Sequence, residues 1–176
     1  MTTDQDKTLA GVKIAIQMEI DGKEYYQKAS QASGNQLGKK LLRQLASEED
    51  LHRQTFEQIF DAIRGREGWP KVDFQPDGGR GLRTIFARAT QEPGADVRAS
   101  ATELDAVKTA MDMENKTYDF YNGQAKNAAY DAEREFYQAL MIQEKEHHLI
   151  LLDYYEYLKD PAAWFVKSEH PSLDAG

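Results

Sequence analysis

Glu49-Asp50-Leu51-His52 and Glu144-Lys145-Glu146-His147 carry one motif, Glu-x-x-His, at two places that lie 95 residues apart. The same offset pairs residues throughout the segments around the motif. The polar pairs are Glu19 with Glu114 and Tyr26 with Tyr121, and the apolar pairs include Val12 with Val107, Ala15 with Ala110 and Leu45 with Leu140. Each lone glutamate precedes its motif by 30 residues. Matches at one fixed offset are typical of an internal repeat, so the sequence predicts a duplicated unit.

Hydrophobic periodicity predicts that each unit is a pair of long helices. Apolar residues recur at spacings of three, four and seven, which places them on one face of a helix. Ser33-Gly34-Asn35 interrupts the first pair, and Asn35 belongs to a residue type that caps helix N-termini. The four helices are expected over residues 8–32, about 36–63, 101–126 and 130–158.

The segment between the two pairs has a different character. Residues 65–100 hold three of the five prolines, and only 82–91 is expected to form a short helix. Two short hairpins joined by one long connection is the connectivity of ferritin-like bundles. The sequence therefore predicts an all-α, ferritin-like four-helix bundle over residues 1–160, with its crossover at about 65–100. The tail, residues 161–176, is expected to pack on the bundle as a short helix and coil.

The composition excludes several classes of site and partner. The 176 residues contain no cysteine, which rules out disulfides, thiolate metal sites, iron–sulfur clusters and a rubredoxin-type centre. The formal net charge of −8 argues against a nucleic-acid surface, and no stretch approaches the roughly 18 apolar residues of a membrane span. Residues 1–7 are polar and no apolar signal-peptide core follows them. We therefore expect a cytoplasmic protein with neither nucleic acid nor a membrane as its partner.

The repeated residues are of the types that hold metal ions in helical bundles. Positions i and i+3 lie on nearly the same face of a helix, so each Glu-x-x-His motif points a carboxylate and an imidazole in one direction. Ferritin-like di-iron proteins use one glutamate from each of two helices and a Glu-x-x-His motif from each of the other two. Oxygen and imidazole ligands suit iron, with manganese and zinc as alternatives. The predicted ligands of two iron ions are Glu19, Glu49, His52, Glu114, Glu144 and His147.

Neighbouring residues offer alternatives to these ligands. A single Glu-x-x-His motif is common in charged helices, and Glu48 and His148 are near enough along their helices to reach the same face. The 95-residue offset disfavours both, because it pairs Glu48 with Gln143 and His148 with Arg53. We interpret His148 as a surface histidine or one that lies behind the ligands, and His170 in the tail as structural or exposed.

Two tyrosines, and hydrogen-bond partners for the histidine ring nitrogens that do not bind metal, complete the predicted site. Tyr26 and Tyr121 each lie seven residues after a lone glutamate, on the same helix face. Each phenol either donates a hydrogen bond to a ligand carboxylate or is an ordinary core tyrosine. The ring nitrogens of His52 and His147 that face away from the metals are expected to meet a carboxylate or a backbone carbonyl. Acidic residues one turn away on neighbouring helices are the candidates.

Over residues 8–158 the chain resembles the rubrerythrin branch of the ferritin-like proteins. The resemblance is carried by Ala15-x3-Glu19-x6-Tyr26, Ser47-Glu48-Glu49-x2-His52, Ala110-x3-Glu114-x6-Tyr121, Glu144-x2-His147 and the ending Asp160-Pro161-x2-Trp164-Phe165. It implies a di-iron site that reduces hydrogen peroxide, and in some members dioxygen, to water. It also implies electrons from a rubredoxin, which must be a separate protein because this chain has no cysteine.

One position departs from the pattern of the family. Rubrerythrins carry a further glutamate three residues after the third-helix ligand, and Thr117 stands at that place. The hypothesis from sequence is a di-iron peroxidase or oxidase, an oxidoreductase that forms a homodimer or small homo-oligomer. Two alternatives stay open, namely a ferroxidase or iron-handling protein and a metal-stabilised bundle without turnover. A large cage-like assembly would favour the ferroxidase.

Overall fold

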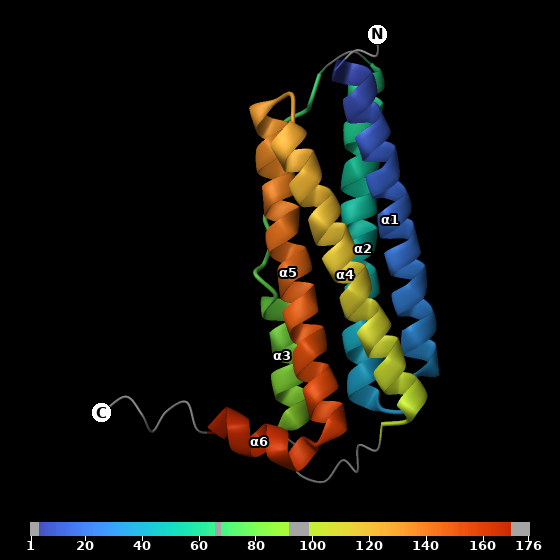
Figure 1. Cartoon of the computed structure of the whole chain (residues 1–176), viewed down its shortest axis with the longest axis vertical. Coiled ribbons are helices and arrows are strands. Elements are labelled where there is room, and N and C mark those ends of the chain that lie inside the picture. The colour runs from blue at the N-terminus through green and yellow to red at the C-terminus, as the bar shows by residue number, and fades with distance from the viewer. Residues whose placement is uncertain (1–3, 66–67, 92–98, 170–176) are drawn as a thin grey trace, which may run out of the picture.

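Four long helices run side by side in the computed structural model, which describes residues 4–65, 68–91 and 99–169 (Figure 1). They are α1 (Asp4–Ala32), α2 (Gln36–Arg64), α4 (Ala101–Asn127) and α5 (Asp131–Lys159). α1 packs mainly on α2 and α4 mainly on α5, so each half of the chain forms a helical hairpin. The described ranges contain no strand. The chain is therefore an all-α, ferritin-like bundle, as the sequence predicts.

Local residue chemistry explains where these helices begin. The side-chain oxygen of Asn35 accepts a hydrogen bond from the backbone N–H of Gly38 at 2.7 Å, which caps α2 as predicted. Ser100 caps α4 in the same way through the N–H of Glu103, at 3.1 Å. α1 begins at Asp4, four residues before the predicted start. Acidic residues in its first turn favour this longer helix, because they complement the positive end of the helix dipole.

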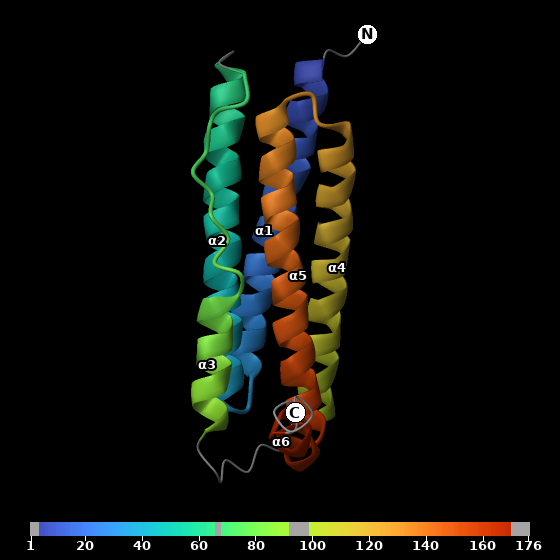
Figure 2. The same ribbon diagram turned by 90° about the vertical axis from the view of Figure 1, so that its left-hand side faces the viewer.

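The crossover runs along the outside of the hairpins and contains α3 (Arg80–Thr90). The trace of residues 68–79 lies beside α5 in Figure 1 and in front of α2 in Figure 2, and α3 contacts both α2 and α5. Trp69 and Phe74 from this segment pack on Phe136 of α5, with ring centroids 5.9 and 5.4 Å apart. The crossover therefore covers the side of the bundle that α2 and α5 form.

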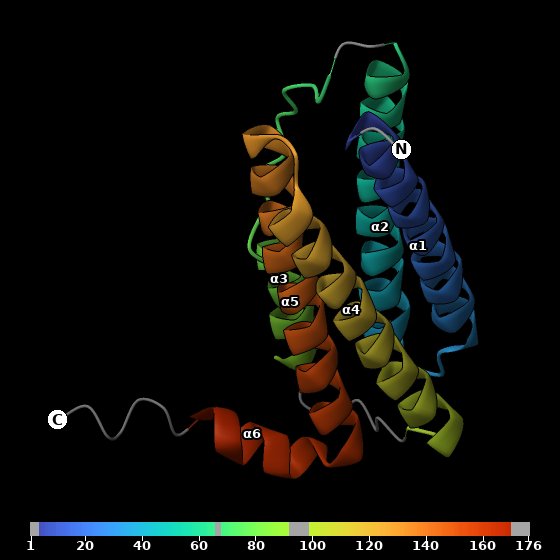
Figure 3. The ribbon, with the colours of Figure 1, turned by 45° about the horizontal axis from the view of Figure 1, so that its top comes forward.

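The tail continues as α6 (Pro161–Glu169), which turns away from the axis of the long helices (Figure 3). The ring of Trp164 packs edge-on against Phe86 of α3 and Tyr157 of α5, with centroids 5.1 and 5.6 Å apart. The described part of the tail thus packs on the bundle, whereas residues 170–176, including His170, lie outside the described ranges.

The core consists of two apolar clusters with a polar layer between them. One cluster includes Leu41, Leu45, Val107 and Ile150, and the other includes Val12, Phe56, Tyr121 and Leu140. On every long helix, the predicted metal ligands fall between residues of the two clusters. The polar layer therefore crosses the bundle near its middle. Within the described part of the chain, no helix combines the length and the apolar character needed to cross a membrane.

Candidate metal centre

The polar layer brings all six predicted ligands together. α1 supplies Glu19, α2 supplies Glu49 and His52, α4 supplies Glu114, and α5 supplies Glu144 and His147. Each of these residues is at most 4% exposed. They form two overlapping groups of four residues. Within each group, every residue offers one oxygen or nitrogen atom, and these four atoms all lie within 4.8 Å of one another. The six side chains therefore form one buried cluster.

The cluster divides into two positions that share two carboxylates. The first group, which we name the His52 position, consists of Glu19, Glu49, His52 and Glu144. The second group, which we name the His147 position, consists of Glu49, Glu114, Glu144 and His147. The Nδ1 atom of His52 lies 3.3 Å from Glu19 and 3.4 Å from Glu144. The Nδ1 atom of His147 lies 3.6 Å from Glu114 and 3.1 Å from Glu49. The 95-residue offset exchanges these two sets of contacts, so the repeat in the sequence is also a repeat in the site.

Many polar atoms of the cluster lack hydrogen-bond partners. Among the described residues, none forms a hydrogen bond with Glu19 Oε2, Glu49 Oε1, either carboxylate oxygen of Glu144, or the Nδ1 atoms of His52 and His147, although these atoms lie close to one another. Buried polar atoms are normally paired, and buried carboxylates normally pair with cations. Four carboxylates and two imidazoles, with no sulfur, suit two divalent cations such as iron or manganese. The donor set therefore fits the expected metals.

Burial and mutual repulsion control the protonation of the cluster. Burial raises the pKa of Glu19 to about 7. Burial, followed by the charges of neighbouring carboxylates, raises the pKa of Glu49 and of Glu144 well above the usual range. Burial disfavours the charged form of His147, but nearby carboxylates, above all Glu114, outweigh it and raise the pKa of this histidine. Cation binding to these groups is therefore coupled to the release of protons.

Two tyrosines connect the halves of the cluster. The hydroxyl of Tyr26 on α1 donates a hydrogen bond to Oε1 of Glu114 on α4, and the hydroxyl of Tyr121 on α4 donates one to Oε1 of Glu19 on α1. Burial, and then these carboxylates, raise the pKa of both phenols well above the usual value, so both stay protonated donors. Of the two interpretations left open by the sequence, the structure shows the hydrogen-bonded one. Each tyrosine holds the lone glutamate of the other half.

Glu48 is a buried site residue that sequence reasoning set aside. One of its carboxylate oxygens lies 2.9 Å from Nε2 of His147, the ring nitrogen that faces away from the cluster. Burial favours the protonated form of Glu48, but the hydrogen bond and charge of His147 outweigh it and lower the pKa of this carboxyl to about 2. This contact is the carboxylate predicted behind a histidine. The available signal was the place of Glu48 on the apolar stripe of its helix, three residues after Leu45.

The surroundings of Nε2 of His52, the ring nitrogen that faces away from the cluster, differ from those of Nε2 of His147. In the described parts of the chain, no carboxylate or backbone carbonyl forms a hydrogen bond with Nε2 of His52, so the prediction is wrong for this histidine. Phe74 of the crossover packs edge-on against the ring, with centroids 5.6 Å apart. Gln143, the repeat partner of Glu48, lies near His52 but donates its side-chain amide to Glu48 at 3.0 Å. An apolar ring and an amide therefore stand where a carboxylate was expected.

Two further residues considered from sequence lie outside the cluster. Nδ1 of His148 is 3.3 Å from the carbonyl oxygen of Met111, and the residue is half-buried. It therefore lies among the helices without joining the ligands, in line with the preference for His147. The hydroxyl of Thr117 donates to the carbonyl of Met113 at 3.1 Å. α4 thus presents a hydroxyl bonded to its own backbone where rubrerythrins have a carboxylate.

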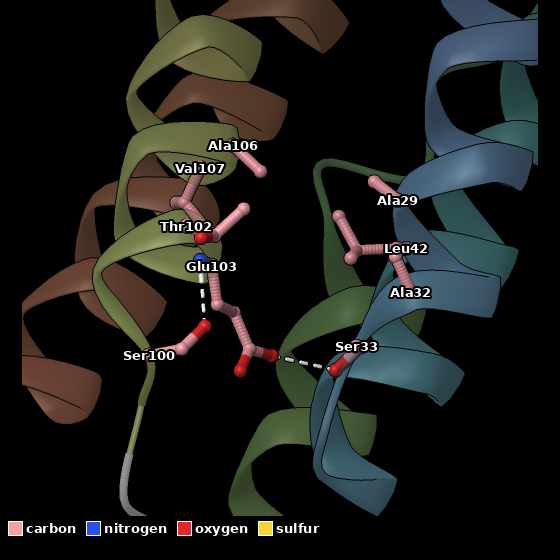
Figure 4. A pocket seen from close by; sticks show the side chains of 9 residues that line it. All are labelled: Ala29, Ala32, Ser33, Leu42, Ser100, Thr102, Glu103, Ala106 and Val107. Atoms are coloured by element: carbon pink, nitrogen blue, oxygen red, sulfur yellow. Dashed lines mark hydrogen bonds between the residues drawn. The ribbon is translucent and has the colours of Figure 1, made fainter.

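The pocket in Figure 4 lies away from the cluster, where α1 ends and α4 begins. It has a volume of about 110 Å³ and a largely apolar lining that includes Ala29, Leu42 and Val107. The carboxylate in its lining, Glu103, accepts hydrogen bonds from Ser33, Asn35 and Tyr154 at 2.6, 2.9 and 3.0 Å. Glu103 therefore ties α4 to the turn between α1 and α2, which is a structural role.

Comparison with known proteins gives a match that covers the whole cluster. A family model described as Rubrerythrin matches residues 12–155, a range that begins inside α1 and ends inside α5. Searches of curated proteins and of solved structures found no match.

Proposed function

The chain belongs to the rubrerythrin family, and on this premise we propose that it is a non-haem di-iron oxidoreductase that reduces hydrogen peroxide or dioxygen. The observation that carries the proposal is the convergence of four glutamates and two histidines in one buried layer, with unpaired oxygen and nitrogen atoms turned toward each other. Two irons held by these residues would supply electrons and Lewis acidity.

The surrounding residues fix the ligands in place. Glu49 and Glu144 belong to both positions, so each is suited to bridge two cations. Tyr26 and Tyr121 hold one oxygen of Glu114 and of Glu19, which leaves the other oxygen of each carboxylate for a cation. Hydrogen bonds of this kind orient ligating groups before the metal arrives.

The burial of the cluster indicates the size of the substrate. The ligands are at most 4% exposed and lie between two apolar clusters. Phe74 of the crossover covers the outer edge of His52. A site enclosed in this way admits small, diffusible molecules more readily than organic substrates, which supports peroxide or dioxygen as the oxidant.

The proposal includes a separate electron donor. The 176 residues contain no cysteine to bind an iron–sulfur or rubredoxin-type centre, so the electrons would come from another protein such as a rubredoxin. A homodimer or small homo-oligomer in the cytoplasm completes the proposal.

The test is the oxidation of the iron-loaded, anaerobically reduced protein, followed by stopped-flow absorbance after mixing with peroxide or with dioxygen. We expect peroxide to oxidise the protein faster than dioxygen does. Glu144→Ala should abolish the reaction, because Glu144 belongs to both positions. The matched control is Glu146→Ala on the same helix, whose carboxylate pairs with the exposed Arg83 and should not affect oxidation.

A ferroxidase is the second candidate, and Thr117 is the observation that favours it. The hydroxyl of Thr117 bonds to its own helix, so α4 lacks the further carboxylate associated with peroxide preference in the family. Faster oxidation by dioxygen, together with a large assembly on sizing, would favour iron handling. Metal binding without oxidation by either oxidant would contradict both functions and leave a metal-stabilised bundle.

A further inference from the structure

The two histidines of the cluster differ in the hydrogen bonding of the ring nitrogen that faces away from the metals, although the repeat makes the two residues equivalent. Positions 48 and 143 correspond at the 95-residue offset, and they are occupied by Glu48 and Gln143. Both side chains are buried and lie on the facing sides of α2 and α5. At this pair beside the cluster the repeat is broken, because one helix carries a charged carboxylate and the other a neutral amide.

Glu48 is held firmly behind His147. Its Oε2 is 2.9 Å from Nε2 of His147 and 3.0 Å from the amide nitrogen of Gln143, and its Oε1 accepts from the amide of Gln44 at 3.0 Å. A carboxylate in this place keeps the proton on Nε2 and leaves the lone pair of Nδ1 directed at the cluster. It also strengthens the imidazole as an electron-pair donor.

His52 has no such support. The neutral side-chain amide of Gln143 stands near its ring in place of a carboxylate, no well-formed hydrogen bond reaches either ring nitrogen within the described ranges, and the ring packs against Phe74. Gln143 bonds to Glu48, so both members of the broken pair serve the same side of the cluster. The tautomer and orientation of His52 are therefore less constrained than those of His147.

We infer that the two metal positions are unequal and that Glu48 makes the His147 position the first to fill. The inference rests on the proposed di-metal site but not on turnover. Partners behind a ligating histidine typically change metal affinity by about 10–100-fold. The His147 position should therefore bind its cation at least about tenfold more tightly than the His52 position.

The experiment loads metal-free protein anaerobically with one equivalent of Mn²⁺ and locates the ion in crystals by anomalous scattering. In the natural protein the peak should lie beside Nδ1 of His147, with at most about a third of that occupancy beside His52, because at one equivalent the occupancy ratio of two independent sites is about the square root of a tenfold affinity ratio. A titration of free Mn²⁺ by electron paramagnetic resonance should give two binding steps. Equal occupancy, or preferential filling of the His52 position, would overturn the inference.

Two variants assign the difference to Glu48. Glu48→Gln keeps an acceptor beside His147 but removes the charge, so the occupancies should become similar. The exchange variant Glu48→Gln/Gln143→Glu keeps composition, net charge and the amide–carboxylate pair, and should move the preference to the His52 position. An exchange variant that folds, as judged by circular dichroism, and still fills the His147 position first would contradict the role of Glu48.

These outcomes separate the inference from the proposed function. Two equal positions in a protein that reduces peroxide would overturn the inference alone. Unequal positions in a protein that reduces neither oxidant would overturn the function alone. A protein that binds no Mn²⁺ at either position would contradict the inference, whereas the iron-loading experiment would decide the function.

Discussion

The hydroxyl of Tyr26 donates its hydrogen bond to Glu114 on α4, not to Glu19, the glutamate of its own helix. Tyr121 makes the reciprocal bond to Glu19, so the two hydrogen bonds cross between the hairpins. α1 and α4 are thereby joined at the level of the cluster, and each half of the repeat positions a carboxylate of the other. The duplication therefore yields one shared site, not two separate ones.

Tyr26→Phe should lower the free energy of unfolding by about 1.5–3 kcal/mol, because it leaves a buried carboxylate oxygen without its donor. The control is Tyr25→Phe, which removes a hydrogen bond to the backbone carbonyl of Ala106, also on α4. Loss of a hydrogen bond to this neutral acceptor should lower the free energy of unfolding by only about 0.5–1.5 kcal/mol. Urea unfolding of both variants measures the difference, and equal losses would argue against a special role for the Tyr26–Glu114 pair.

Gly22→Ala should weaken metal binding at both positions. A Cβ atom at this buried helical glycine would lie 3.2 Å from Oε2 of Glu49, so the carboxylate would have to move by a few tenths of an ångström. Glu49 is shared by the two positions. Isothermal titration with Mn²⁺ should show a lower affinity for both ions.

The control for that substitution is Gly123→Ala in α4, where a Cβ atom would meet open space. It should stabilise the fold by up to about 1 kcal/mol, because alanine favours a helix more than glycine does. Its Mn²⁺ affinity should equal that of the natural protein. If both substitutions left the affinity unchanged, the close fit of Gly22 to Glu49 would not matter for the site.

Removal of metal should destabilise the fold, and increasingly so as pH rises. The pKa values of Glu19 (about 7), Glu49, Glu144 and His147 in the folded chain lie above their unfolded values, so the metal-free folded state binds more protons than the unfolded state. Its stability therefore falls as pH rises from about 4.5 to about 7 and beyond. His52, Glu48 and Glu114, whose pKa values are lowered, act in the opposite sense, His52 below about 6.5 and the two glutamates below about 4.5.

Melting temperatures with Mn²⁺ and with chelator, measured from pH 5 to pH 8, test this coupling. Metal takes the place of the protons, so the gap between the two melting temperatures should widen with pH. A gap that stays constant, or that narrows at high pH, would contradict proton release from the cluster.

The repeat explains why so much of the fold and the site could be predicted. Because Glu19 and Glu114 share one offset with both Glu-x-x-His motifs, the sequence identifies which residues are equivalent, and the periodicity puts them on inward faces. An offset cannot identify what breaks the equivalence. Phe74 covers His52 only because the crossover follows one side of the bundle, and the target of Glu48 depends on the packing of α2 against α5.

Thr117→Glu should shift the reactivity of the reduced protein toward peroxide. Thr117 lies one turn after Glu114 on α4, so a glutamate there could reach the His147 position once the hydroxyl bond to Met113 is lost. Thr117→Gln has the same length without the charge and should not cause the shift. Stopped-flow rates with peroxide and dioxygen give the ratio for each protein. A natural protein whose peroxide-to-dioxygen ratio already equals that of Thr117→Glu would show that the carboxylate is dispensable.

The central claim is that six side chains hold two metals, and a crystal structure of the iron-loaded protein, with anomalous data at the iron edge, tests it most directly. We expect two iron peaks per chain, roughly 3.5–4 Å apart. One should lie beside Nδ1 of His52 and the other beside Nδ1 of His147, with Glu49 and Glu144 contacting both. A single peak, iron bound elsewhere, or Glu19 and Glu114 turned away from the ions would contradict it.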